Sequence, residues 1–166
     1  MELISSDTNI WIDFSCADFL YGPFSMSEKY QFIISAYTLE KELVYPADLG
    51  HRLLELGLQP VEVQRDEISL ADVYEKYSML SLYDRFALAI AKHRRIILLT
   101  GDADLRKAAM KEGVEVHGSL WVVDEAYEGN KITLQTYKDV LESFLSSPRI
   151  RLPRGEIIKR LARLQA

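Results

Sequence analysis

The sequence predicts an α/β domain in which a mainly parallel sheet is covered by helices on both faces. Two short apolar runs, residues 2–5 and 96–99, have almost no polar alternation, which is typical of strands buried on both faces. Helical segments of about ten residues or more separate most of the candidate strands, as in parallel sheets. With 166 residues, of which 48% are hydrophobic and 27% charged, the chain is long enough for one core. We therefore expect a single three-layer domain.

The remaining elements follow from local patterns along the chain. Two more strands are expected at residues 32–35 and 114–117. Leucines recur at roughly helical spacing over residues 38–56, and Pro46 is expected to break that helix in two. The other expected helices cover residues 70–78, 83–93, 102–112, 119–128, 133–145 and 155–164.

Charge is distributed unevenly along the chain. The formal net charge is −5, but residues 149–166 hold six basic residues and one acid, which leaves −10 for residues 1–148. The two parts meet near Pro148. We expect residues 1–148 to form the domain and residues 149–166 a basic helical tail, which packs on this domain or on a partner through an apolar stripe.

The composition also bears on location. Cys16 is the one cysteine, so the chain cannot form an internal disulfide. The first residues do not resemble a signal peptide, and no apolar run approaches the roughly 20 residues of a membrane-spanning helix. These features predict a cytoplasmic protein that does not enter a membrane.

Acidic residues fall close to the ends of the predicted strands. Asp7 and Asp102 each follow a buried strand, and Glu40 and Glu42 are expected in the first turn of the helix after the second strand. Asp84 opens the helix that leads into the strand at 96–99. Because the carboxyl ends of parallel strands meet at one edge of a sheet, we expect these carboxylates to lie together there.

Four carboxylates at one edge repel one another unless a cation neutralises them. Oxygen ligands without His or Cys favour Mg²⁺ or Mn²⁺. The three histidines, His51, His93 and His117, fall away from these positions, so zinc is not expected.

Each acid also has a purely structural interpretation. Asp84 and Asp102 can serve as helix N-caps. Glu40 and Glu42 can favour a helix dipole from its first turn. Asp13 is expected on the surface. The coincidence of four acids at one edge, and no single position, favours a functional site.

Four segments carry a resemblance to a known family. They read ISSDTNIWID at residues 4–13, ISAYTLEKEL at 34–43, LSLYDRFALAIA at 80–91 and ILLTGDADLRKAA at 97–109. In this order and at this spacing they resemble the PIN-domain family, and GVEVHGSLW at residues 113–121 resembles a prokaryotic branch of it.

The resemblance implies a three-layer α/β/α PIN-like fold and a ribonuclease that depends on Mg²⁺ or Mn²⁺. Proteins of this kind are frequently homodimers and frequently the toxin of a toxin–antitoxin pair, so the resemblance implies an antitoxin and a second copy of the chain as partners. Its site residues, carried over to this sequence, comprise three metal ligands, a second catalytic acid with its alternative, and three supporting polar residues. They are Asp7, Asp84 and Asp102; Glu42, with Glu40 as the alternative; and Asn9, Thr100 and Ser81.

An RNA substrate requires positive charge near these carboxylates. Arg85, Arg106 and Lys107 are the first candidates, and the tail that begins at Arg149 is another. Their contacts would be to phosphate, with affinity that falls as salt rises and little sequence preference.

Two other functions remain to be weighed. A phosphotransferase of the haloacid dehalogenase type needs a second Asp two residues after Asp7, and Asn9 stands there, which disfavours it. A catalytically silent PIN-like module that binds nucleic acid or a protein stays open as the alternative to a nuclease.

Overall fold

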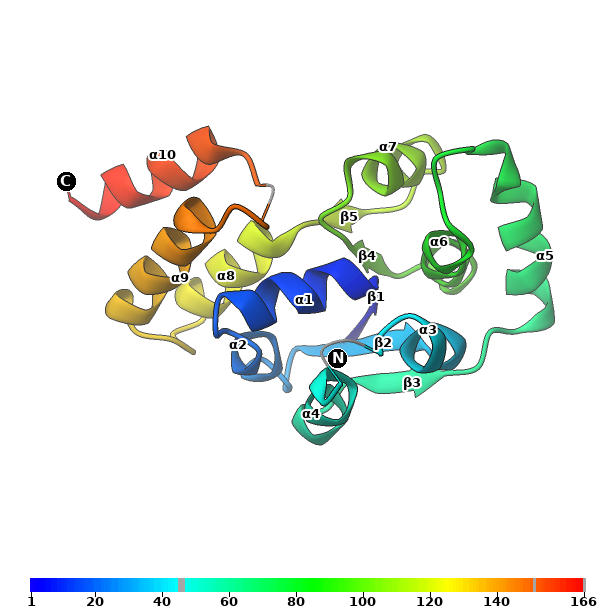
Figure 1. The fold of residues 1–166 in the computed structure, drawn as a ribbon, viewed down its shortest axis with the longest axis horizontal. Helices are drawn as coiled ribbons and strands as arrows, with labels where there is room; N and C mark the ends of the chain where they lie inside the picture. The colour runs from blue at the N-terminus through cyan, green and yellow to red at the C-terminus, as the bar shows by residue number, and fades with distance from the viewer. Residues whose placement is uncertain (45–46, 151, 166) are drawn as a thin grey trace.

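Five parallel strands form the centre of the computed structural model, which describes residues 1–44, 47–150 and 152–165 (Figure 1). Their order across the sheet is β3-β2-β1-β4-β5. In chain order they are β1 (Glu2–Ser6), β2 (Tyr30–Ser35), β3 (Gln59–Val61), β4 (Ile97–Leu99) and β5 (Val116–His117). The strand β1 pairs with β2 on one side and with β4 on the other, so the first strand of the chain lies at the centre of the sheet.

Helices cover both faces of the sheet. In chain order they are α1 (Thr8–Cys16), α2 (Tyr21–Phe24), α3 (Ala36–Lys41), α4 (Leu49–Leu56), α5 (Arg65–Val73), the 3₁₀ turn η1 (Tyr74–Lys76), α6 (Leu82–Arg94), α7 (Ala103–Lys111), α8 (Ser119–Glu128), α9 (Leu134–Ser146) and α10 (Arg154–Leu164). Successive side chains of β4 enter different cores: Ile97 and Leu99 join the one built with α1, α8 and α9, and Leu98 joins the one built with α6 and α7. This alternation is the period of two expected of a strand covered on both sides. The predicted three-layer α/β fold is confirmed.

The sequence does not predict three elements of the structure: the strand β3 and the helices α1 and α2. The strand β3 has three residues, and its Pro60 lies opposite Ile34 at the edge of the sheet, where a missing N–H is tolerated. The helices α1 and α2 were also not expected. In α1 the residues Ile10, Trp11 and Phe14 are fully buried, at the spacing of one helical face.

The broken helix predicted over residues 38–56 corresponds to two helices, α3 and α4, and the first starts two residues earlier than predicted. The hydroxyl of Ser35 accepts a hydrogen bond from the Thr38 N–H, which starts α3 directly after β2, and α4 begins only at Leu49. The predicted break at Pro46 lies outside the described residues.

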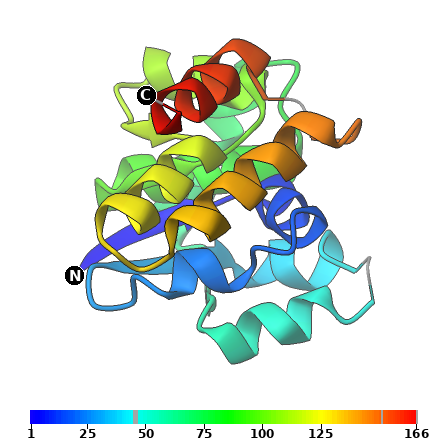
Figure 2. The same ribbon diagram turned by 90° about the vertical axis from the view of Figure 1, so that its left-hand side faces the viewer.

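The C-terminal helix α10 packs on α9, which lies beside α8 (Figure 2). Ile157 is buried in the larger core. The guanidinium of Arg160 donates to both oxygens of Asp124 in α8, with Nε and Nη2 at 3.0 and 2.8 Å. The buried side chain of Ile157 and the bidentate ion pair between Arg160 and Asp124 thus hold α10 against the rest of the domain. Across the described residues, no helix is long and apolar enough to cross a membrane.

Candidate metal-binding site

The carboxyl ends of β1, β2 and β4 meet at one edge of the sheet, since the three strands are parallel neighbours. Asp7 follows the last residue of β1, and Asp102 follows β4 after two intervening residues. The structure therefore places these two acids on the edge where the sequence predicts them.

Asp7 is the most constrained of the acids. It caps α1, where its Oδ1 accepts from the Ile10 N–H at 3.1 Å, and its Oδ2 accepts from the Thr100 hydroxyl. Only 4% of the residue is exposed. Burial raises the pKa of the Asp7 carboxyl to about 7 against the pull of these hydrogen bonds, and the charges of Asp84 and Asp102 raise it further. The three carboxylates are thus close enough to interact.

Thr100 links two of these acids. Its hydroxyl donates to Asp7 and accepts from the Asp102 N–H at 3.0 Å, and the residue is fully buried. Asp102 caps α7, with its Oδ1 accepting from the Asp104 N–H at 3.0 Å. A side chain with one donor and an acceptor oxygen can make both contacts at once, which fixes Asp7 relative to the turn that carries Asp102.

Asp84 lies in the first turn of α6, where Ser81 is the N-cap. The two residues form a reciprocal capping box: the Ser81 N–H donates to Asp84 Oδ2 at 3.0 Å, and the Asp84 N–H donates to the Ser81 hydroxyl at 3.1 Å. Burial raises the pKa of the Asp84 carboxyl despite these hydrogen bonds, and the charge of Asp102 adds to the rise. Ser81 therefore orients Asp84, as a supporting residue would.

The structure shows which of the two glutamates, Glu42 or Glu40, lies at the acidic edge. Thr8, the neighbour of Asp7, donates its hydroxyl to Glu42 Oε2 at 2.6 Å. Burial raises the pKa of the Glu42 carboxyl, the Thr8 hydrogen bond opposes this, and the charge of Asp84 raises the pKa further. The Glu40 side chain is 75% exposed and lies 3.8 Å from Lys41. Glu42, and not Glu40, therefore shares the edge with Asp7 and Asp84.

The predicted position of both glutamates in a first helical turn is wrong. Because Ser35 caps α3 immediately after β2, Glu40 falls in the last turn of that helix and Glu42 is its C-cap. The contact with Thr8 joins residues 34 positions apart, and the sequence gives no signal for it.

A cavity of about 530 Å³ opens beside Asp102. Asn9, the predicted supporting residue, is exposed and lines it together with Asp13, Asp104 and Arg149. Asp13 is not the plain surface acid that the sequence predicts: burial raises the pKa of its carboxyl to about 6, and the charge of Arg149 opposes that rise. Asn9 and Asp13 are four residues apart and so share one face of α1, a signal that depends on predicting that helix.

The predicted RNA-binding cations lie in different settings. The guanidinium of Arg85 donates to the Ala71 carbonyl in α5 at 3.1 Å, inside the contact of α5 with α6. The guanidinium of Arg106 lies against Gly118, where a Cβ would come within 3.0 Å of it. Lys107 is exposed and lines a separate pocket with Lys76. None of the three lines the cavity beside Asp102.

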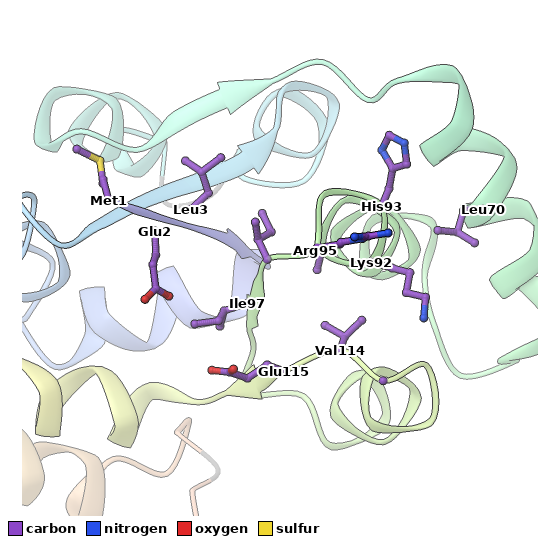
Figure 3. A pocket seen from close by; sticks show the side chains of 13 residues that line it. Met1, Glu2, Leu3, Leu70, Lys92, His93, Arg95, Ile97, Val114 and Glu115 are labelled. Atoms are coloured by element: carbon purple, nitrogen blue, oxygen red, sulfur yellow. The ribbon is translucent and has the colours of Figure 1, made fainter.

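A larger cavity, of about 920 Å³, opens at the opposite edge of the sheet, where β1 begins. Figure 3 shows Arg95 and Lys92 on one side of it and Glu2 and Glu115 on the other. None of the predicted site residues lines it. Two of them, Asn9 and Asp102, line the cavity of about 530 Å³ instead, so we assign the candidate site to the carboxyl edge.

The donor set at the carboxyl edge suits a hard cation, because it consists of carboxylate and hydroxyl oxygens. The imidazole of His117, whose backbone lies beside Thr100, stacks on Trp121 at 4.3 Å and contacts Glu115. Within residues 1–44, 47–150 and 152–165, no three His, Cys, Asp or Glu side chains are arranged as a preformed metal-binding group.

The sheet order and the carboxylates at its edge define a class of α/β protein with an acidic site at the carboxyl ends of parallel strands. A family model described as a PIN domain matches residues 6–166. The chain belongs to the PIN-domain family, whose members are generally nucleases and typically use divalent metal ions. No curated protein and no solved structure matches the chain.

Proposed function

We propose that this protein is a ribonuclease that depends on Mg²⁺ or Mn²⁺ and hydrolyses RNA phosphodiester bonds at the edge defined by Asp7. The observation that carries the proposal is the state of Asp7: a buried carboxyl, fixed by Thr100, whose pKa is raised to about 7 by burial and by its acidic neighbours. A divalent cation is the group that relieves such repulsion.

Four acids share the work in this proposal. Asp7 and Asp102 would hold the cation directly, with Asp84 and Glu42 bound to it directly or through water. When bound, the cation lowers the pKa of a coordinated water and offsets charge on the phosphate. Thr100 and Ser81 orient Asp7 and Asp84 by the hydrogen bonds described above.

The proton released by the attacking water needs an acceptor. Glu42 and Asp84 are the candidates, because each has a carboxyl pKa raised by burial and so holds a proton more readily than an exposed acid. Thr8 donates to one oxygen of Glu42, which leaves the other oxygen, Oε1, for the proton.

Cleavage of single-stranded RNA with Mn²⁺ tests the proposal. We expect cleavage by the wild type and a loss of at least about 100-fold with Asp7→Asn, because that variant lacks a charge that would hold the cation; one general acid–base group alone contributes about 10²–10⁴ in rate. Glu42→Gln is expected to lose activity similarly, whereas the matched variant Glu40→Gln, two residues away and exposed, keeps it. Thermal melting checks that each variant folds. Equal cleavage by the wild type and Asp7→Asn, or none by either, rejects the nuclease.

A catalytically silent binding module is the second candidate. It is favoured by the absence, in the part of the chain that the structure describes, of a preformed group of three metal-ligating side chains. Titration calorimetry with Mn²⁺ separates the two functions, because the silent module would bind RNA without binding the ion at Asp7. Heat of binding that disappears in Asp7→Asn favours the nuclease.

A role as the toxin of a toxin–antitoxin pair, and a homodimeric state, belong to the same proposal. Their support is the resemblance to PIN-domain toxins. A small DNA-binding protein encoded in the neighbouring reading frame is the expected antitoxin, and its absence would favour RNA processing instead. Light scattering of the purified protein tests the dimer.

A further inference from the structure

The cavity beside Asp102 is lined by three acids and one cation. Asp13, Asp102 and Asp104 supply the negative charge, and Arg149 the positive charge. An RNA strand that reaches Asp102 has to bring its phosphates into this cavity, against the repulsion of the acids. Arg149 is the cation placed to offset that repulsion.

Three other cations of the basic tail are engaged elsewhere. Arg160 is paired with Asp124, and Arg154 donates to the Leu145 carbonyl at 2.9 Å. Lys159 lies 3.3 Å from Glu156. Among the described residues, Arg149 forms no salt bridge within 4 Å.

The backbone at Arg149 is held in place from both sides. Its neighbour Ile150 is buried in the larger core, and α9, which ends at Ser146, packs through Phe144 into the same core. The Arg149 side chain itself is exposed. The burial of Ile150 thus holds the backbone of Arg149 at the cavity, while the charged side chain of Arg149 stays exposed.

Asp13 lines the same cavity as Arg149. Its carboxylate lies against Gly101, in the turn between β4 and Asp102, with Oδ2 at 3.5 Å from the place of a Cβ. The charge of Arg149 acts on this carboxylate. Arg149 and the turn that carries Asp102 therefore line one cavity, with the Asp13 carboxylate beside that turn.

We propose that Arg149 binds a phosphate of the RNA strand across the cavity from Asp102 and so positions the strand on the carboxylate edge. A guanidinium can donate two parallel hydrogen bonds to a phosphate, which fixes orientation as well as charge. This inference rests on the proposed ribonuclease function. It assigns one substrate-positioning residue, Arg149, which lies more than 40 positions after Asp102 in the chain.

Binding of a fluorescently labelled single-stranded RNA, followed by anisotropy with Ca²⁺ across a series of salt concentrations, tests the contact. Arg149→Gln is expected to weaken binding about tenfold. It should also reduce the slope of log affinity against log salt by about 0.7, the value for one phosphate contact on a single strand. Arg149→Lys should keep the slope and recover only part of the affinity, because an ammonium lacks the planar fork.

Arg163→Gln is the matched control, because it removes the same charge from an exposed position on α10. It should leave the salt slope unchanged. Kinetics with Mn²⁺ add a second readout: Arg149→Gln is expected to raise KM more than it lowers kcat.

The outcomes separate the contact from the function. If the wild type binds and cleaves RNA but Arg149→Gln matches it, or if Arg163→Gln causes the same loss, the contact is overturned and the nuclease stands. If the wild type neither binds nor cleaves RNA, the proposed function is overturned, and the contact with it.

Discussion

At the scale of single residues, Asp7 combines two roles that usually fall to different side chains. One oxygen caps α1, and the other accepts from Thr100 at the centre of the acidic edge. Asn is nearly as good an N-cap as Asp. Substitution by Asn therefore removes the charge and keeps most of the local structure, which makes Asp7 a position where charge can be studied apart from fold.

The raised pKa of Asp7 predicts how stability depends on pH in the metal-free protein. A carboxyl whose pKa is raised on folding stabilises the folded state while it is protonated, and this stabilisation is lost as pH rises from about 4 through about 7. We expect Asp7→Asn to gain on the order of 3 kcal/mol in unfolding free energy relative to the wild type between pH 4 and pH 8.

Urea unfolding at both pH values, with EDTA present, measures this difference. Glu40→Gln is the control, because its exposed side chain should give the same difference at both. A pH-independent difference for Asp7→Asn would show that the buried carboxyl does not titrate in this range.

At the scale of elements, the sequence predicts what local pattern determines. The apolar runs of β1 and β4 and the helical spacing of α6 to α10 are visible in the chain. The short strand β3, which contains Pro60, and the helix α1 are not, because each is fixed by contacts with distant residues. The site divides in the same way.

Strand ends predict Asp7 and Asp102 directly, because a residue that follows a buried parallel strand has only one edge to occupy. The choice of Glu42 over Glu40 depends on the contact with Thr8, and the position of Arg149 depends on the path of the chain between α9 and α10. Both depend on tertiary contacts, which leave no local pattern in the sequence.

The packing of α10 gives a prediction at this scale. Ile157 is 1% exposed and its neighbour Ile158 is 51% exposed. Ile157→Ala should lower the unfolding free energy by about 2–4 kcal/mol, because it leaves a cavity in the core, and Ile158→Ala by well under 1 kcal/mol. Urea denaturation of the two variants measures this. Equal effects would mean that α10 does not dock through Ile157.

At the scale of the whole molecule, the proposed ion at the acidic edge would couple its binding to folding. An ion that binds the folded chain and not the unfolded chain raises the melting temperature with its concentration. Ligand carboxylates must lose their protons to bind, so affinity also rises with pH.

We therefore expect Mn²⁺ to raise the melting temperature of the wild type by several degrees at pH 8, and by less at pH 6, where Asp7 is largely protonated. Scanning calorimetry measures the shift, with Mn²⁺ at about 100 times its dissociation constant. Asp7→Asn should show almost none. The same shift in Asp7→Asn and the wild type would place the bound ions elsewhere on the acidic surface.

The central position of β1 has a consequence for synthesis on the ribosome. One of its two neighbours in the sheet, β4, is translated about 90 residues later than β1 itself. The nascent chain thus carries Asp7 long before Asp102, and Arg149 is added later still. The carboxylate edge therefore forms only after β4 has been translated and has paired with β1.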